Sequence, residues 1–177
     1  EDGDIIAFQY YDASEDEILD ISETIAFEIN AVYGDVIAPY ELNITTAIEF
    51  EHNLIAGYNW ISVNVIPEND SLQSILGSLG DDAIFIQSQS DGSATNYGAY
   101  GWYGSLEPMD PSNMYLLEMD DAATFTITGM PVEASAPIAL IDGSNWIGFT
   151  PQNPGNISLA LESVSDDASF IQSQASG

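Results

Sequence analysis

Residues 56–92 read AGYNWISVNVIPENDSLQSILGSLGDDAIFIQSQSDG, and residues 142–177 read DGSNWIGFTPQNPGNISLALESVSDDASFIQSQASG. The two stretches are copies of one unit: Trp60 matches Trp146 at an offset of 86 residues, and the string FIQSQ returns at an offset of 85. A period of this length is typical of a tandem array of small domains rather than of a thin solenoid coil. Further β-rich sequence follows the first FIQSQ, but the second is followed by only three residues. We therefore expect the second copy to be incomplete.

The composition combines the apolar content of a folded protein with an extreme charge. Apolar residues make up 45% of the chain, which is ordinary for a globular protein and unlike an acidic disordered tail. There are 29 Asp and Glu residues and no Lys or Arg, giving a formal net charge of −29. The carboxylates must therefore be stabilised by water, backbone N–H groups or cations. Because salt screens their mutual repulsion, we expect salt to stabilise the fold.

The charge excludes several classes of partner. Nucleic acids bind through Lys and Arg, which the chain lacks, so no nucleic-acid partner is expected. Anionic lipid surfaces are unfavourable for the same reason, and no apolar run approaches the roughly 20 residues of a membrane span. The chain has no cysteine, which excludes disulfides and thiolate chemistry. Acidity and β-rich patterning together favour an extracellular or cell-surface location.

Residues 1–53 are predicted to form an N-terminal β module that is truncated. The segment 4–13 has the composition of a strand, and 21–30 alternates apolar and polar residues as a half-buried strand does. An acidic turn is expected over 12–20, and a strand opened by proline over 39–50.

Residues 54–134 are predicted to be the first full repeat, and 135–177 the partial second repeat. The first contains a short amphipathic helix near 70–79, whose N-cap is expected at Asn69 or Asp70. Its apolar residues follow helical spacing: Leu72, Ile75, Leu76 and Leu79. The equivalent helix near 156–164 has Asn156 as its N-cap. The fold class is therefore mainly β with two short helices, arranged as tandem small β-rich modules.

Recurrent strings in this sequence resemble a known kind of module. NWISVNV, LQSILGSL, FIQSQ, GWYGSLEPMDPSNMYLLEM and NWIGFTPQ are similar to the GWNWIS, IKSQ, GWYGSL, PGxMYKI and NWIGY strings of tandem β-rich modules in large secreted or cell-surface proteins of Bacteroidota-type bacteria. The resemblance covers nearly the whole chain and implies a structural or adhesive setting, with no catalytic residues to carry over. This chain departs from that pattern where those modules have Lys, with Gln87, Gln172, Leu116 and Glu118 in its place.

Aromatic residues suggest an alternative function in carbohydrate binding. Sugar rings stack on exposed aromatic faces while nearby polar groups bind their hydroxyls. Trp60 and Trp146 begin matching strands, so we assign them to the core. The better surface candidates lie in a glycine-flanked, turn-rich stretch: Trp102, Tyr103, Tyr100 and Tyr97. The glutamines of the two FIQSQ strings alternate with isoleucine, which strand patterning alone explains.

Clustered acids suggest a second alternative, a linker stiffened by calcium. Calcium takes 6–8 oxygen ligands, which short acidic loops supply, although no cluster has EF-hand spacing. The candidate ligands are Asp12, Asp16, Asp20, Asp81, Asp82, Asp166 and Asp167.

The sequence does not favour an enzyme. His52 is the single histidine, and neither a GxSxG nor an HExxH motif occurs. We expect a non-enzymatic extracellular structural or adhesive module of a repeat-containing surface protein, filament or large assembly. Its expected partners are other copies of itself or neighbouring subunits, with glycans as the alternative, and its cofactor, if any, is calcium.

Overall fold

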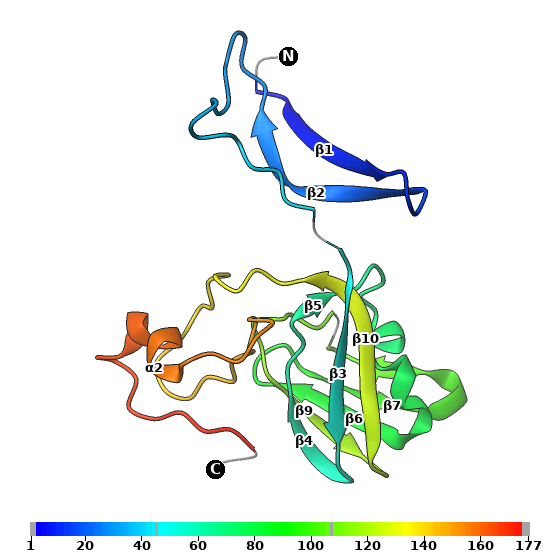
Figure 1. Cartoon of the computed structure of the whole chain (residues 1–177). Helices are drawn as coiled ribbons and strands as arrows, with labels where there is room; N and C mark the ends of the chain where they lie inside the picture. The colour runs from blue at the N-terminus through cyan, green and yellow to red at the C-terminus, as the bar shows by residue number, and fades with distance from the viewer. Residues whose placement is uncertain (1–2, 45, 107, 175–177) are drawn as a thin grey trace. The chain divides into compact units, whose positions relative to one another are not determined.

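The computed structural model describes residues 3–44, 46–106 and 108–174. The chain divides into two compact units, Glu1–Ala47 and Ile48–Gly177. Strands form three sheets, and the helices are short (Figure 1). The prediction of a mainly β chain with short helices is confirmed.

The first unit is built on one antiparallel hairpin of β1 (Ile5–Asp12) and β2 (Glu17–Ala26). The turn between the strands is shorter than the predicted acidic turn over 12–20. Asp12 accepts hydrogen bonds from the backbone N–H and hydroxyl of Ser14, at 2.8 and 2.6 Å, and Asp16 adopts a left-handed φ of 55°. These two features complete the turn within a few residues, so β2 begins before residue 20.

The strand predicted over 39–50 is wrong in its first half. Ile44 makes only an isolated bridge to Ile21, and β3 (Ile48–Leu54) begins later and belongs to the second unit. Glu23 accepts hydrogen bonds from the backbone N–H of Asn43, at 2.8 Å, and from its side-chain amide. This carboxylate holds the segment against β2 without a strand ladder.

The second unit contains two sheets. The smaller has the order β3-β10-β5, with the long strand β10 (Ala123–Pro131) between β3 and β5 (Val65–Ile66). Along β10, Phe125 and Ile127 are buried, whereas the threonines between and beside them are at least partly exposed. The strand therefore presents one apolar face to the core.

The larger sheet has five strands in the order β4-β9-β6-β7-β8, all antiparallel. Their bounds are β4 Gly57–Ile61, β9 Tyr115–Met119, β6 Ala83–Ser88, β7 Ser93–Asn96 and β8 Trp102–Gly104. A 3₁₀ turn, η2 (Gly98–Tyr100), connects the last two strands. The first FIQSQ string lies largely in β6, as its alternation predicts.

The first helix is shorter than predicted and starts from a different cap. Helix α1 spans Leu72–Ile75, and its N-cap is Ser71, whose side chain accepts from the N–H of Ser74. Asn69 instead accepts from the N–H and hydroxyl of Ser71. The 3₁₀ turn η1 (Gly77–Asp82) follows, and a φ of 55° at Gly80 interrupts it.

The second helix repeats this arrangement. Helix α2 spans Ile157–Ala160, with Asn156 as its N-cap as predicted, and the 3₁₀ turn η3 (Glu162–Val164) follows it. Because Ser71 and Asn156 are equivalent positions of the repeat, both copies begin the helix at the same place. Within the residues that the structure describes, no helix is long and apolar enough to cross a membrane.

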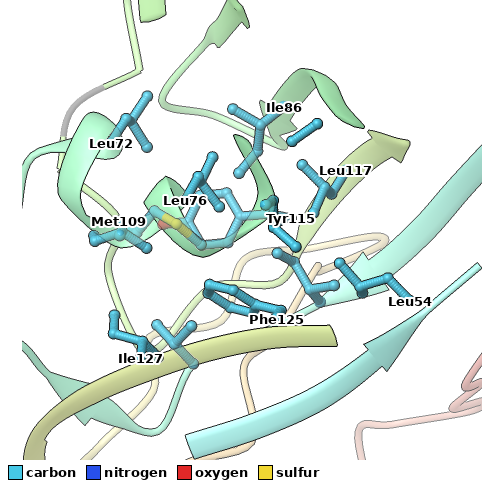
Figure 2. Packing of buried hydrophobic residues seen from close by; sticks show 14 of the residues in the cluster. Leu54, Leu72, Leu76, Ile86, Met109, Tyr115, Leu117, Phe125 and Ile127 are labelled. Atoms are coloured by element: carbon cyan, nitrogen blue, oxygen red, sulfur yellow. The ribbon is translucent and has the colours of Figure 1, made fainter. Parts of the chain in front are cut away.

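One core joins both sheets and α1 of the second unit (Figure 2). Tyr115 lies at its centre, fully buried, and its hydroxyl accepts from the N–H of Asp110 at 2.6 Å. Burial raises the pKa of Tyr115. The other large buried side chains come from α1, η1, β3, β4, β5, β6, β9 and β10 and the loops between them: Leu54, Ile61, Val63, Val65, Leu72, Ile75, Leu76, Leu79, Ile86, Leu106, Met109, Leu117, Met119, Phe125 and Ile127.

Candidate functional site

The two repeat copies have the same loop at their beginning. In the first, the Asn59 side chain donates to the carbonyls of Ile55 and Gly57, at 2.8 and 3.1 Å, and accepts from the N–H of Ile55 at 3.0 Å. A left-handed φ of 88° at Gly57 makes the loop possible. The asparagine thus replaces backbone hydrogen bonds inside a tight loop.

The loop of the second copy matches it bond for bond. Asn145 donates to the carbonyls of Ile141 and Gly143, at 2.8 and 3.2 Å, and accepts from the N–H of Ile141 at 2.9 Å. The φ of Gly143 is 96°. The spacing I-x-G-x-N therefore encodes a recurrent loop directly before each tryptophan.

The last glutamine of the first FIQSQ string binds the second copy. Gln89 donates to the carbonyl of Ser144 and accepts from the N–H of Trp146, both at 2.6 Å. Its amide therefore occupies one donor and one acceptor of the Ser144–Trp146 backbone, as a neighbouring strand would.

The equivalent glutamine of the second copy makes the reverse contact. Gln174 donates to the carbonyl of Tyr58 and accepts from the N–H of Trp60, both at 2.7 Å. These backbone groups belong to β4, whose other edge pairs with β9. The prediction that strand patterning alone explains the glutamines of the two FIQSQ strings is therefore wrong for Gln89 and Gln174. The sequence held a signal for this contact, because both the Asn-Trp pair and the last Gln of FIQSQ occur in each copy.

A second set of hydrogen bonds fixes residues 149–152 against residues 62–64. Phe149 donates its N–H to the hydroxyl of Ser62 at 3.2 Å. Asn64 donates to the carbonyl of Pro151 at 3.0 Å, and Gln152 donates to the carbonyl of Asn64 at 2.7 Å. The buried Oδ1 of Asn64 has no hydrogen-bond partner among the described residues. Such an atom costs about 1–3 kcal/mol unless water or a ligand reaches it.

Glycine permits close packing beside this contact. Gly148 donates to the carbonyl of Ser112 at 2.7 Å, and Met114 donates to that of Trp146 at 3.1 Å. A Cβ atom on Gly148 would lie 2.0 Å from the carbonyl oxygen of Pro111. Only glycine therefore fits at this point without a backbone shift.

These contacts leave a hollow beside β3 and β4, which we call the β3–β4 hollow. Its volume is about 210 Å³, and its lining residues are Phe50, His52, Trp60, Ile61, Ser62, Asn64 and Phe149. Trp60 is 37% exposed and Phe149 49% exposed, so the prediction that Trp60 lies in the core is wrong. The alternation of β4 explains this, because Asn59 and Ile61 occupy its inward positions. That Phe50 and Phe149 line the same hollow was not predictable, since they lie 99 positions apart in the sequence.

Apolar residues of the helix and the FIQSQ string are far more exposed in the second copy than in the first. Leu72 of α1 is 0% exposed and its equivalent Ile157 is 55% exposed; Ile86 is 0% exposed and its equivalent Ile171 is 47% exposed. In the first copy, β6 pairs with β7 and β9. Within the described part of the chain, residues 168–174 form no strand. The second copy thus has its helix without the sheet that covers the first.

The predicted aromatic candidates lie around η2 and β8. Tyr97, Tyr100 and Tyr103 are exposed, and the rings of Tyr97 and Tyr103 meet edge to face at 6.0 Å. Trp102 is half-buried and packs against the core. The structure therefore brings three of the four together on the surface and uses the fourth in packing.

The predicted acidic ligands do not converge. Among residues 3–44, 46–106 and 108–174, no three His, Cys, Asp or Glu side chains are placed to hold a metal ion. Asp16 accepts from the hydroxyl of Tyr11 at 2.5 Å, and Asp20 accepts from the amide of Gln9 at 2.9 Å. Hydrogen bonds from Ser14 lower the pKa of Asp12. The remaining candidates follow the helices and are exposed: Asp81, Asp82, Asp166 and Asp167.

No protein-family model matches this chain, and no curated protein or solved structure is significantly similar to it. The geometry of the site is therefore the basis for any functional proposal. Its two features are the reciprocal glutamine contact between the copies and the exposed apolar residues of the second copy.

Proposed function

We propose that this chain is a non-enzymatic extracellular structural or adhesive module of a repeat-containing surface protein, filament or large assembly. In this proposal the second copy accepts a β-strand from a neighbouring repeat. The donated strand takes the place that β9 has beside β6 in the first copy.

The proposal rests on one observation, the different burial of equivalent apolar residues. Ile157 and Ile171 are exposed at the positions where Leu72 and Ile86 are fully buried. Leaving large apolar side chains in water forfeits about 1.5–3 kcal/mol for each, which a partner that covers them would recover. A strand with the alternating pattern of Tyr115–Met119 would cover them, because that strand lies in the same core cluster as Leu72 and Ile86.

A β-strand also fits the hydrogen-bonding needs of this surface. Strand addition joins an extended segment to an open backbone edge through main-chain bonds, while alternate side chains enter apolar pockets. Residues 168–172 form no strand in the described structure, so a donated strand would have no existing ladder to displace there. The net charge of −29 makes acidic partners repel one another, and salt screens this repulsion, so association should be stronger at moderate or high salt.

A synthetic peptide with the sequence of residues 112–131, SNMYLLEMDDAATFTITGMP, tests the proposal. The peptide is titrated into the whole chain at 0.15 M salt or above, and amide shifts are followed by NMR. We expect saturable shifts concentrated at residues 157–172, with a scrambled peptide as control. Replacing Ile171 by Asp should abolish binding, whereas the same change at the exposed Val36 in the first unit should not.

Shifts confined to the first copy would contradict the proposal, and so would equal binding of the scrambled peptide. Sedimentation velocity of the chain alone gives an independent measure. The exposed surface predicts weak self-association that rises with concentration and salt, and that Ile171→Asp reduces.

A further inference from the structure

We propose that the β3–β4 hollow is a binding site for a single uncharged sugar ring. The site differs from the tyrosines around η2 that the sequence suggested. None of its lining residues belongs to the strand-accepting surface at residues 157–172, so the inference does not depend on the proposed function.

The walls of the hollow have the chemistry that binds the C–H face of a sugar. Phe50, Trp60 and Phe149 line it and come from β3, β4 and the start of the second copy. Trp60 and Phe149 keep large exposed fractions although both lie in a concave place. Aromatic side chains with one free face are the usual partners of apolar ligand faces.

Polar groups among these rings suit hydroxyl ligands. Ser62 lines the hollow, and because its oxygen accepts from the N–H of Phe149, its own proton is free to donate. His52 supplies a ring nitrogen as donor or acceptor. Asn64 also lines the hollow, and its amide nitrogen already donates to the carbonyl of Pro151. A hydroxyl group, which both donates and accepts, satisfies this combination.

Charge restricts the ligand further. Among the described residues, no Asp or Glu lines the hollow, so no carboxylate is placed there to pair with an organic cation. An anion would be repelled by the formal charge of −29 that the whole chain carries. A neutral ligand avoids this repulsion and needs no carboxylate partner.

Size restricts the ligand to one ring. Pockets for drug-sized ligands measure about 300–1,000 Å³, whereas the hollow measures about 210 Å³. A longer glycan would have only one residue inside. Because Phe149 belongs to the second copy, the site exists only while the two copies are in contact.

NMR of the whole chain tests the inference through the indole N–H signal of Trp60. The probes are the methyl glycosides of glucose, galactose and mannose and N-acetylglucosamine, with tetramethylammonium chloride and sodium acetate as charged controls at matched ionic strength. We expect a saturable shift with at least one sugar and none with either salt. Phe149→Leu, which keeps the apolar bulk but removes the aromatic face, should weaken binding about tenfold or more.

Tyr103→Leu is the matched control, because it removes an exposed aromatic ring outside the hollow. It should leave the dissociation constant unchanged. The inference is overturned if no sugar shifts the Trp60 signal, if only tetramethylammonium does, or if Tyr103→Leu abolishes binding while Phe149→Leu does not. Strand-peptide binding is measured on the same variants and should be unaffected by Phe149→Leu, which separates the failure of one proposal from failure of the other.

Discussion

Gln89 and Gln174 occupy the same position in the two repeat copies, and each binds the backbone of the other copy. Each side-chain amide contacts one carbonyl and one N–H at 2.6–2.7 Å. The exchange uses four hydrogen bonds and no charged group. For a chain without a basic side chain, amide groups are the available means of joining polar surfaces, since ion pairs between side chains of Asp or Glu and Lys or Arg cannot form.

Replacing either glutamine by alanine should loosen the opposite copy. Gln174→Ala leaves the N–H of Trp60 without its partner, and Gln89→Ala does the same for Trp146. Each lost hydrogen bond is worth about 0.5–1.5 kcal/mol, toward the lower end for exposed side chains. Amide hydrogen exchange should accelerate at Trp60 in Gln174→Ala and at Trp146 in Gln89→Ala.

Gln87→Ala and Gln172→Ala are the matched controls for that experiment. These glutamines belong to the same two strings, and their side chains make no hydrogen bond within the described structure. Exchange at Trp60 and Trp146 should stay as in the unmodified chain. Unchanged exchange in Gln89→Ala and Gln174→Ala as well would show that the reciprocal contact contributes no stability.

The two loop asparagines should differ in importance despite their equal bonding. Asn59 is buried, so Asn59→Ala leaves backbone groups of Ile55 and Gly57 unpaired and should cost about 2–3 kcal/mol. Asn145 is more exposed, and water replaces its bonds, so Asn145→Ala should cost about 1 kcal/mol or less. Chemical denaturation measures both; equal losses would refute the argument from burial.

Gly148→Ala should disrupt the contact between the second copy and the segment before β9. The new methyl group would overlap the Pro111 carbonyl, and a shift there breaks the hydrogen bond from Gly148 to Ser112. We expect a loss of about 1–3 kcal/mol and a change in Trp146 fluorescence. Gly77→Ala is the control, because a Cβ at Gly77 meets nothing within 4 Å and should be nearly neutral.

Much of the first copy could be predicted from local pattern. Alternation located β6 within FIQSQ, and the spacing of Leu72, Ile75 and Leu76 located the buried face of α1. The exact helix cap was missed because Asn69, Asp70 and Ser71 are all good N-caps. Ser71 is the N-cap because the side chain of Asn69 instead accepts hydrogen bonds from Ser71. Those bonds depend on the conformation of the loop.

Contacts between residues far apart in the sequence could not be predicted from local pattern. The position of Phe149 beside Trp60 depends on how the second copy docks, which no local pattern encodes. The strand predicted over 39–50 failed for a related reason, since the side chain of Glu23 binds Asn43 where a strand would have formed a ladder. The repeat itself, by contrast, correctly indicated a second short helix with Asn156 as its N-cap.

Added salt should stabilise the chain, and calcium should do no more than its ionic strength requires. Repulsion among 29 carboxylates opposes the compact state, and salt screens it. Within the described residues the acids do not form a metal site. Thermal unfolding in NaCl, MgCl₂ and CaCl₂ at equal ionic strength checks this. A midpoint raised much further by calcium than by magnesium, and reversed by chelator, would support the calcium-stiffened linker instead.

Acidification should destabilise the turns of the first unit through particular carboxylates. Bonds from the backbone N–H groups of Ala38 and Ile37 lower the pKa of Asp35 below 3.8. Bonds from Asn43 lower the pKa of Glu23 below 4.5. Because each pKa is lower in the folded state, the stabilisation is present above the unfolded value and is lost as the pH falls through the folded one.

The side-chain carboxyl shifts of Asp35 and Glu23, followed by NMR from pH 6 to about 2, measure this directly. Both titration midpoints should lie below those of the same residues in short peptides. Asp35→Asn keeps an oxygen that accepts from Ile37 and Ala38 but does not titrate, so its turn should persist to lower pH. Midpoints no lower than those of carboxyl groups in the same chain that lack such bonds would mean that these turns do not form in solution. Repulsion acts on all the carboxylates of this chain, whereas the hydrogen bonds favour the charged form of these two in particular.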